Sequence, residues 1–103
     1  MRITRLLHEI LFISSSKPQT IRLEKGADGL GFTIVGGRGS PHGDLPIYVK
    51  NVFDTGAAAK EGSLKRGHQI LAVNGQSLEG ASHEEAVKLL KHLQGVIELE
   101  VLQ

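Results

Sequence analysis

The chain has 103 residues, 40% of them hydrophobic, which suits one domain with a single modest core. Twelve Lys and Arg stand against eleven Asp and Glu, and because these charges are interspersed, nucleic acid is not expected as the main partner. The absence of cysteine excludes disulfides and thiolate metal sites and agrees with a reducing compartment.

Residues 1–19 are expected to form an extension that is separate from a domain spanning residues 20–103. The polar stretch Ser14–Pro18 is typical of a linker. Apolar residues before it recur at helical spacing and predict a short helix: Ile3, Leu6, Leu7, Ile10 and Leu11. Three interpretations stay open, namely a frayed extension, a helix that packs on the domain, and a self-association surface within residues 3–13.

Strands are expected directly after this extension. Alternating residues predict one at Thr20–Glu24, and an apolar run predicts a second at Phe32–Val35. The segment Gly36–Asp44 is rich in glycine and proline and is expected to be a loop. Leu45-Pro46 then leads into a third strand at Ile47–Val52.

The turn Gly29-Leu30-Gly31-Phe32 precedes the second strand directly. Because glycine takes positive φ without steric cost, this turn can hold the N–H groups of Leu30, Gly31 and Phe32 in a concave nest that accepts an anion. A carboxylate fits such a nest. Phosphate is disfavoured, since Ile34 stands where a Rossmann fingerprint needs its third glycine, and no Gly-Lys-Ser/Thr occurs. An ordinary glycine turn in a hairpin is the alternative.

The second half of the chain mixes short elements with one longer helix. The short ones are a single helical turn at Ala57–Glu61, a strand at Gln69–Val73, a short strand near Gln76–Leu78 and a final strand at Val96–Leu102. Gly62 is expected to close the helical turn, and Asn74-Gly75 suits a tight hairpin turn.

The longer helix is predicted at Ser82–Leu93. Ser82 and Glu85 have the spacing of a capping box, and Gly95 is expected to end the helix. Its apolar residues divide between two adjoining faces. Ala86, Leu89 and Leu93 are expected to face the core, whereas His83, Val87 and Leu90 form a neighbouring stripe.

The order of these parts resembles a PDZ domain over about residues 20–102. The matching pieces are Lys25 before Gly26-Ala27-Asp28, Gly29–Phe32, Ile47–Val49, Gly56–Ala59, Leu64–Gly67, Ile70–Gly75 and Ser82–Val87. The resemblance implies an α+β, mainly β fold: a small, partly open antiparallel barrel or sandwich of five to six strands capped by two helices. One departure is His68, since PDZ chains usually have Asp there, and its loss weakens the expectation for that turn.

The resemblance also implies a module that captures the free C-terminus of a partner in a groove between the second strand and the long helix. The ligand carboxylate would meet the amides of Leu30, Gly31 and Phe32, and Lys25 would help through water. The last ligand side chain would enter a pocket made of Leu30, Phe32, Ile34, Val87 and Leu90.

Two further positions concern ligand selectivity. His83 would hydrogen-bond a Ser or Thr hydroxyl on the third-from-last ligand residue, which implies the pattern Ser/Thr-x-Val/Leu/Ile with a free carboxylate. Thr33 and Lys50 are expected beside the fourth-from-last residue, where an acidic side chain would be preferred.

Catalysis is not expected, because each template fails on a named residue. Val87 stands where the zincin pattern needs a second histidine, and Arg38 and His42 stand where a nucleophile elbow around Ser40 needs glycines. We therefore expect no enzyme activity, no metal and no cofactor.

The expected partners are C-terminal peptides of membrane receptors, channels, adhesion or signalling proteins, bound in the cytoplasm at the inner face of the plasma membrane or at cell junctions. Self-association and anionic lipid remain rival hypotheses. The basic residues that suggest contact with phosphoinositide or a membrane surface are Lys17, Arg22, Lys25, Lys65 and Arg66.

Overall fold

A computed structural model describes residues 17–27 and 29–103. The strands are β1 (Gln19–Glu24), β2 (Phe32–Ser40), β3 (Gly43–Val52), β4 (Gln69–Val73), β5 (Gln76–Ser77) and β6 (Val96–Leu102), and the helices are α2 (Ala57–Glu61) and α3 (His83–His92). The predicted helix over residues 3–13 and most of the predicted extension lie outside the described residues. Every expected strand and both expected helices of the described part are present.

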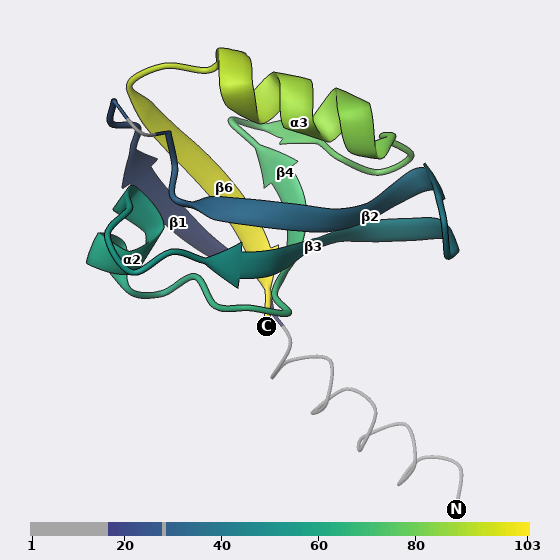
Figure 1. Cartoon of the computed structure of the whole chain (residues 1–103), viewed down its shortest axis with the longest axis horizontal. Helices are drawn as coiled ribbons and strands as arrows, with labels where there is room; N and C mark the ends of the chain where they lie inside the picture. Colours follow the sequence, from purple (N-terminus) through teal and green to yellow (C-terminus); the bar gives the residue numbers. More distant parts are fainter. Residues whose placement is uncertain (1–16, 28) are drawn as a thin grey trace, which may run out of the picture.

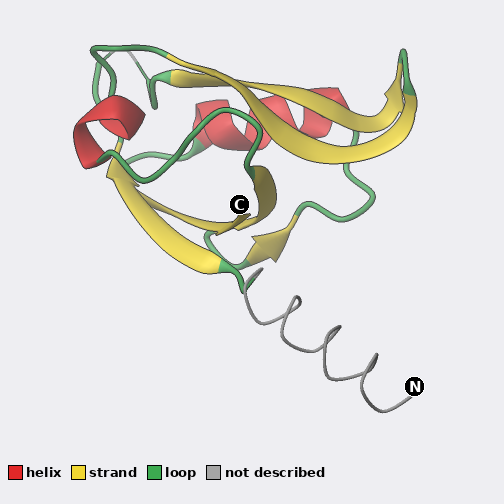
Figure 2. Cartoon of the chain, turned by 90° about the horizontal axis from the view of Figure 1, so that it is seen from below, coloured by secondary structure: helices red, strands yellow, loops and turns green. Residues whose placement is uncertain are grey.

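The strands form one antiparallel sheet with the order β1-β6-β4-β3-β2, and β5 pairs with β4. β1 and β2 are therefore the two edges, and the described strands do not close into a complete barrel. Helix α3 lies along β2, and α2 lies at the opposite end of the β2–β3 hairpin from its turn (Figures 1 and 2). The predicted fold class, a partly open antiparallel arrangement with two helices, is confirmed.

The core forms where alternating apolar residues of the strands face inward. Ile21 and Leu23 of β1 are buried opposite Leu99 and Ile97 of β6, while the residues between them are exposed or half-buried. Ala58 of α2 is also fully buried. No polar or charged residue is buried in the described part of the chain. The interior is thus purely apolar, and polar chemistry is confined to the surface.

The prediction of a loop at Gly36–Asp44 is wrong, because β2 continues to Ser40 and β3 already begins at Gly43. Gly36 and Gly37 have φ of 96° and 102°, and register shifts lie beside both residues. The glycines therefore bend and twist the ladder as bulges do and do not interrupt it. The Oδ1 atom of Asp44 also accepts a 2.8 Å hydrogen bond from the N–H of Gly39, which holds the hairpin end.

Pro46 lies inside β3, not ahead of it as predicted. Gly36 pairs with Ile47 and Gly37 pairs with Leu45, so Pro46 is the extra residue of a bulge. A proline at an unpaired bulge position costs the sheet no hydrogen bond, because an N–H group at that position would have no acceptor on the facing strand. This is why the strand tolerates it.

Helix α3 begins as predicted but differs at its end. Ser82 accepts a hydrogen bond from the N–H of Glu85 and donates its own N–H to the Glu85 carboxylate, so the predicted capping box is present. The helix stops at His92 with Leu93 as its C-terminal cap, not at Gly95. The hydrogen bonds from Ser82, led by its backbone N–H, lower the pKa of Glu85.

The assignment of the core face of α3 also needs correction. Leu89 and Leu93 are half-buried and pack against the core as expected, but Leu90, expected on the groove stripe, is only 9% exposed and belongs to the core with Ala86. Positions 86 and 90 lie one turn apart on the same helix face. Leu90 therefore serves the core and the groove wall together.

His68 replaces the missing Asp as a hydrogen-bond acceptor. Its Nδ1 accepts from the N–H of Lys65 at 3.2 Å, and its own N–H donates to the Lys65 carbonyl at 3.2 Å. The His68 carbonyl accepts from Val49 at 2.8 Å, which ties the turn to β3. Partial burial, followed by the charge of Lys65, lowers the pKa of His68. The turn thus depends on a neutral imidazole.

Protonation of His68 is expected to destabilise the domain. Because the pKa in the folded state lies below the ordinary value of about 6.5, the stabilisation is complete above that value and is lost as the pH falls toward the folded-state pKa. The variant His68→Asn keeps a side-chain acceptor without a titrating group. Urea unfolding at several pH values between 5 and 8 should show a shallower pH dependence for His68→Asn than for the wild type. Identical slopes would contradict this role of His68.

Candidate functional site

A groove of about 400 Å³ lies between β2, α3 and the turn before β2. Nine of the predicted site residues line it: Lys25, Leu30, Gly31, Phe32, Thr33, Ile34, His83, Val87 and Leu90. Lys50 does not line it. Gly29, Phe53 and Lys91 line it as well, and the sequence interpretation had not named Phe53 or Lys91 as site residues.

The turn before β2 directs its carbonyl groups inward. The Leu30 carbonyl accepts from the N–H of Ala58 at 3.0 Å, and the Gly31 carbonyl accepts from the N–H of Phe53 at 2.9 Å. Gly29 and Gly31 have φ of 85° and 83°. The N–H groups of Leu30 and Gly31 have no acceptor within residues 17–27 and 29–103. Among the described residues the turn therefore leaves these two amides without an acceptor, the arrangement that suits an anion.

Close backbone packing fixes this turn against the start of α2. A Cβ atom on Gly31 would lie 2.6 Å from the Cα of Gly56, and one on Gly56 would lie 2.5 Å from the Cα of Gly31. Two glycines that face each other in this way let the two backbones touch. The position of the amides thus depends on the absence of side chains at both residues.

The edge of β2 is open over only part of its length. β2 pairs with β3 on one side, and the N–H of Arg38 donates to the Ala81 carbonyl at 2.8 Å on the other. At Gly37 the strand comes so close to α3 that an added Cβ would lie 2.5 Å from the His83 nitrogen. Because the Gly36 carbonyl also faces the His83 ring, the edge that remains open runs from Phe32 to Val35.

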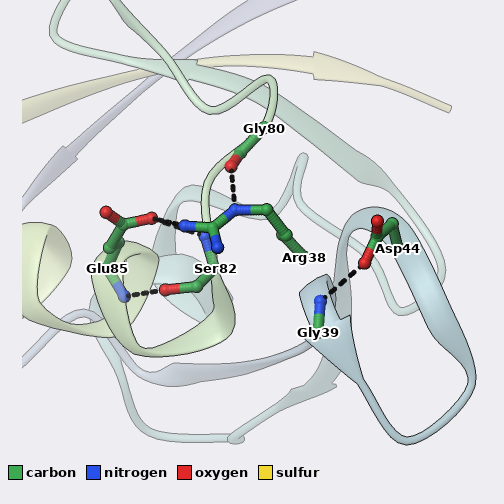
Figure 3. Close-up of polar contacts among 6 residues, drawn as sticks. All are labelled: Arg38, Gly39, Asp44, Gly80, Ser82 and Glu85. Atoms are coloured by element: carbon green, nitrogen blue, oxygen red, sulfur yellow. Dashed lines mark hydrogen bonds and ion pairs between the residues drawn. The ribbon is translucent and has the colours of Figure 1, made fainter.

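Side-chain contacts of Arg38 reinforce this closed end (Figure 3). Its Nε donates to the Gly80 carbonyl at 2.9 Å, and its Nη2 lies 3.0 Å from Oε1 of Glu85. Because both charged side chains are more than half exposed, the ion pair itself contributes little to stability. Its geometric effect is to hold the first turn of α3, and with it His83, against β2.

His83 occupies the first position of α3. Its Nδ1 lies 3.1 Å from the Gly36 carbonyl, and since a carbonyl only accepts, this nitrogen carries the hydrogen. In the neutral ring Nε2 is then left with a lone pair. Because His83 lines the groove, this tautomer leaves Nε2 able to accept a hydrogen bond.

Lys25 lies at the other end of the groove and holds the end of α3. Its Nζ donates to the carbonyls of Leu90 at 3.0 Å and Leu93 at 2.8 Å, and also to that of Lys91. A cation at a helix C-terminus is stabilised by the carbonyls left without partners there. Both ends of α3 are thus attached to the sheet side of the groove, one through Arg38 of β2 and the other through Lys25 in the connection from β1 to β2.

Thr33 and Lys50 are both exposed, on neighbouring strands. Thr33 pairs with Asn51 and Ile34 pairs with Val49, so Lys50 is the extra residue of a bulge. A bulge redirects the side chains around it. This register could not be seen in the sequence.

Phe53 and Lys91 were missed for different reasons. Phe53 follows an apolar strand and would ordinarily be counted as core, yet 51% of it is exposed. Lys91 has the position of an ordinary solvated helix residue. An aromatic residue just past a strand end is a weak signal, but it is the only one the sequence offers for Phe53.

The predicted basic patch is partly used for other contacts. Arg22 pairs with Glu98 at 2.9 Å, and Lys25 donates to the carbonyls at the end of α3. No helix within residues 17–27 and 29–103 has both the length and the apolar composition needed to span a membrane. In the same residues no three His, Cys, Asp or Glu side chains are grouped as metal ligands would be.

Comparison with known sequences gives a consistent result. A family model described as PDZ domain matches residues 20–102. Identity to Multiple PDZ domain protein of Rattus norvegicus is 69% over 84 residues, which cover 82% of this chain and 4% of that relative. Identity to Protein lin-7 homolog B of Bos taurus is 48% over 84 residues, which cover 82% of this chain and 40% of the relative. The chain thus spans less than half of either relative.

A solved structure agrees with this result. The crystal structure of Dlg1 PDZ2 from the choanoflagellate Monosiga brevicollis matches with a TM-score of 0.76 and 42% identity, covering 84% of this chain and 97% of that chain. The family match, the sequence identities and the fold together show that this chain belongs to the PDZ domain family.

Proposed function

We propose that this domain binds the free C-terminus of a partner protein by adding it as a strand to the edge of β2. The observation that carries the proposal is the open edge Phe32–Val35, which begins beside the amides of Leu30 and Gly31, two groups without an acceptor among the described residues. Family membership supports a protein-interaction module without catalysis. An added strand gains main-chain hydrogen bonds, and the pockets beside it supply selectivity.

A chain terminus satisfies this geometry better than an internal peptide. Its carboxylate meets the amides of Leu30, Gly31 and Phe32, and the charge of Lys25 adds a favourable field at that end. The contact of Arg38 with Ala81 closes the far end, so only about four or five ligand residues can pair. An internal peptide would leave the amides of Leu30 and Gly31 without an anion.

The last ligand side chain enters the apolar pocket beside the turn, which favours Val, Leu or Ile. The pocket residues are Leu30, Phe32, Ile34, Val87 and Leu90. Upstream, exposed Thr33 and Lys50 contact the fourth-from-last residue, and Lys50 favours an acidic side chain there by a small, salt-sensitive margin.

The free Nε2 of His83 accepts a hydrogen bond from a Ser or Thr hydroxyl at the third-from-last position. His83→Ala should weaken binding of a Thr-x-Val peptide by about 1 kcal/mol, and of the matching Ala-x-Val peptide by much less. His92→Ala, an exposed histidine at the far end of the same helix, is the control. A double-mutant cycle without coupling between His83 and the ligand hydroxyl would remove His83 from the site.

Chemical-shift mapping of the 15N-labelled domain tests the proposed mode of binding. A peptide ending in Thr-x-Val should shift the amides of Leu30, Gly31 and the open part of β2 most, with affinity in the micromolar range, because a short strand buries less than a standard interface. Shifts confined to the opposite edge, β1, would contradict the proposal.

The proposed partners are the C-terminal tails of membrane receptors, channels, adhesion or signalling proteins, met at the inner face of the plasma membrane or at cell junctions. Two rival functions have separate tests. Sedimentation with liposomes of anionic and neutral lipid tests membrane binding. Analytical ultracentrifugation of residues 1–103 against 17–103 tests self-association through residues 3–13.

A further inference from the structure

Phe53 is a large apolar side chain that the fold leaves uncovered. It follows β3 and is 51% exposed, more than Val35 or Leu45, which are each 40% exposed. It also lines the groove beside the amide turn. Exposing an aromatic ring loses the burial that it would gain in the core. The ring is therefore available for contact at the site itself.

Backbone contacts fix where this ring stands. The N–H of Phe53 donates to the Gly31 carbonyl at 2.9 Å, which places Phe53 directly beside the turn that carries the amides of Leu30 and Gly31. Val52 pairs with Phe32 and packs against the core. Since successive side chains of an extended chain alternate, Phe53 projects to the outer, solvent-facing side.

We propose that Phe53 is a specificity-determining residue that contacts the penultimate side chain of the bound C-terminus and favours an apolar or aromatic residue there. The inference rests on the proposed function. In an added strand the last side chain enters the pocket beside α3, so the penultimate one points away from α3. It then lies over the outer face of β2 and β3, where Phe53 stands beside the terminus. Aromatic and aliphatic side chains that meet on such a surface bury apolar area from water.

A double-mutant cycle tests this contact. Calorimetry would compare free-acid peptides ending in Thr-Trp-Val, Thr-Leu-Val and Thr-Gly-Val against the wild type, Phe53→Ala and Phe53→Leu. The wild type should bind the Trp and Leu peptides roughly fivefold more tightly than the Gly peptide, the scale of one aromatic contact. Phe53→Ala should remove this difference while leaving the Gly peptide within about twofold of wild type, and Phe53→Leu should restore part of it. Leu45→Ala, an equally simple truncation outside the groove, should preserve the wild-type ranking.

The outcomes separate this inference from the proposed function. If Phe53→Ala weakens all three peptides equally, or leaves the Trp preference intact, Phe53 does not read the penultimate residue, although strand addition still stands. If the wild type binds none of the three peptides, the proposed function itself fails. Urea unfolding of each variant shows whether a loss of affinity for all peptides arises from misfolding. If Phe53→Ala does not fold, the peptide ranking measured with Phe53→Leu, which retains most of the apolar volume, decides the question.

Discussion

Gly31→Ala should destabilise the domain by about 3 kcal/mol and nearly abolish peptide binding, since it combines a strained φ with a backbone clash. Gly31 has a φ of 83°, and an added Cβ would lie 2.6 Å from the Cα of Gly56. The clash must move the turn away from α2, and the amides of Leu30 and Gly31 move with it. The effect is expected in both the free energy of unfolding and the affinity for a Thr-x-Val peptide.

Two matched variants separate the two causes. Gly29→Ala meets the same kind of strain, with a φ of 85°, but has no atom within 4 Å of the added Cβ, so it should cost about 1 kcal/mol. Gly56→Ala has an ordinary φ of −87° and only the clash, at 2.5 Å from Gly31. Urea unfolding should therefore rank Gly31→Ala as the least stable. Equal stability of Gly31→Ala and Gly29→Ala would show that the contact with Gly56 does not matter.

Leu90→Ala should lower the free energy of unfolding by about 2–5 kcal/mol and weaken the binding of every C-terminal peptide. The reason is that the same side chain packs in the core and lines the pocket. Leu90 is 9% exposed, and it packs in the main core cluster while lining the groove. Removing its isobutyl group leaves a cavity that opens into the groove. Bulkier terminal residues should then lose less affinity than Val.

Lys88→Ala, an exposed change on the same helix, is the control for Leu90→Ala and should leave both quantities within about 0.5 kcal/mol of wild type. Leu90→Met keeps the volume and should remain folded if Leu90→Ala does not. If Leu90→Ala weakens binding no more than Lys88→Ala does, the last ligand side chain lies elsewhere.

The fold could be predicted where local pattern and packing agree. The alternation in β1 and β6, the capping box at Ser82 and the turn at Asn74-Gly75 all depend on neighbours in sequence, and each is present. The extension of β2 and β3 beyond their predicted ends was missed because glycine and proline usually break strands. Here bulges at Gly36 and Pro46 accommodate these residues within the strands. Whether a bulge forms depends on the pairing with the facing strand, which the local sequence does not show.

The candidate site likewise has features that the local sequence predicts and others that depend on contacts between residues far apart in the chain. The apolar groove residues could be chosen from periodicity and resemblance, since each faces the same gap. The bond between His83 and Gly36, and the three carbonyls that Lys25 meets, join residues more than forty positions apart, so no local pattern contains them. Leu90 was assigned to one face only, because helical spacing does not say how far a helix sinks into the sheet.

The most direct test of strand addition at a free C-terminus is calorimetry with one peptide in two forms. The peptide ends in Thr-x-Val, either as the free acid or as the C-terminal amide, so that only the anion differs. The free acid should bind with a micromolar Kd. The amidated peptide should bind at least about tenfold more weakly, because the backbone N–H groups of Leu30 and Gly31 then lose their charged acceptor. Equal Kd values for the two forms would contradict the account.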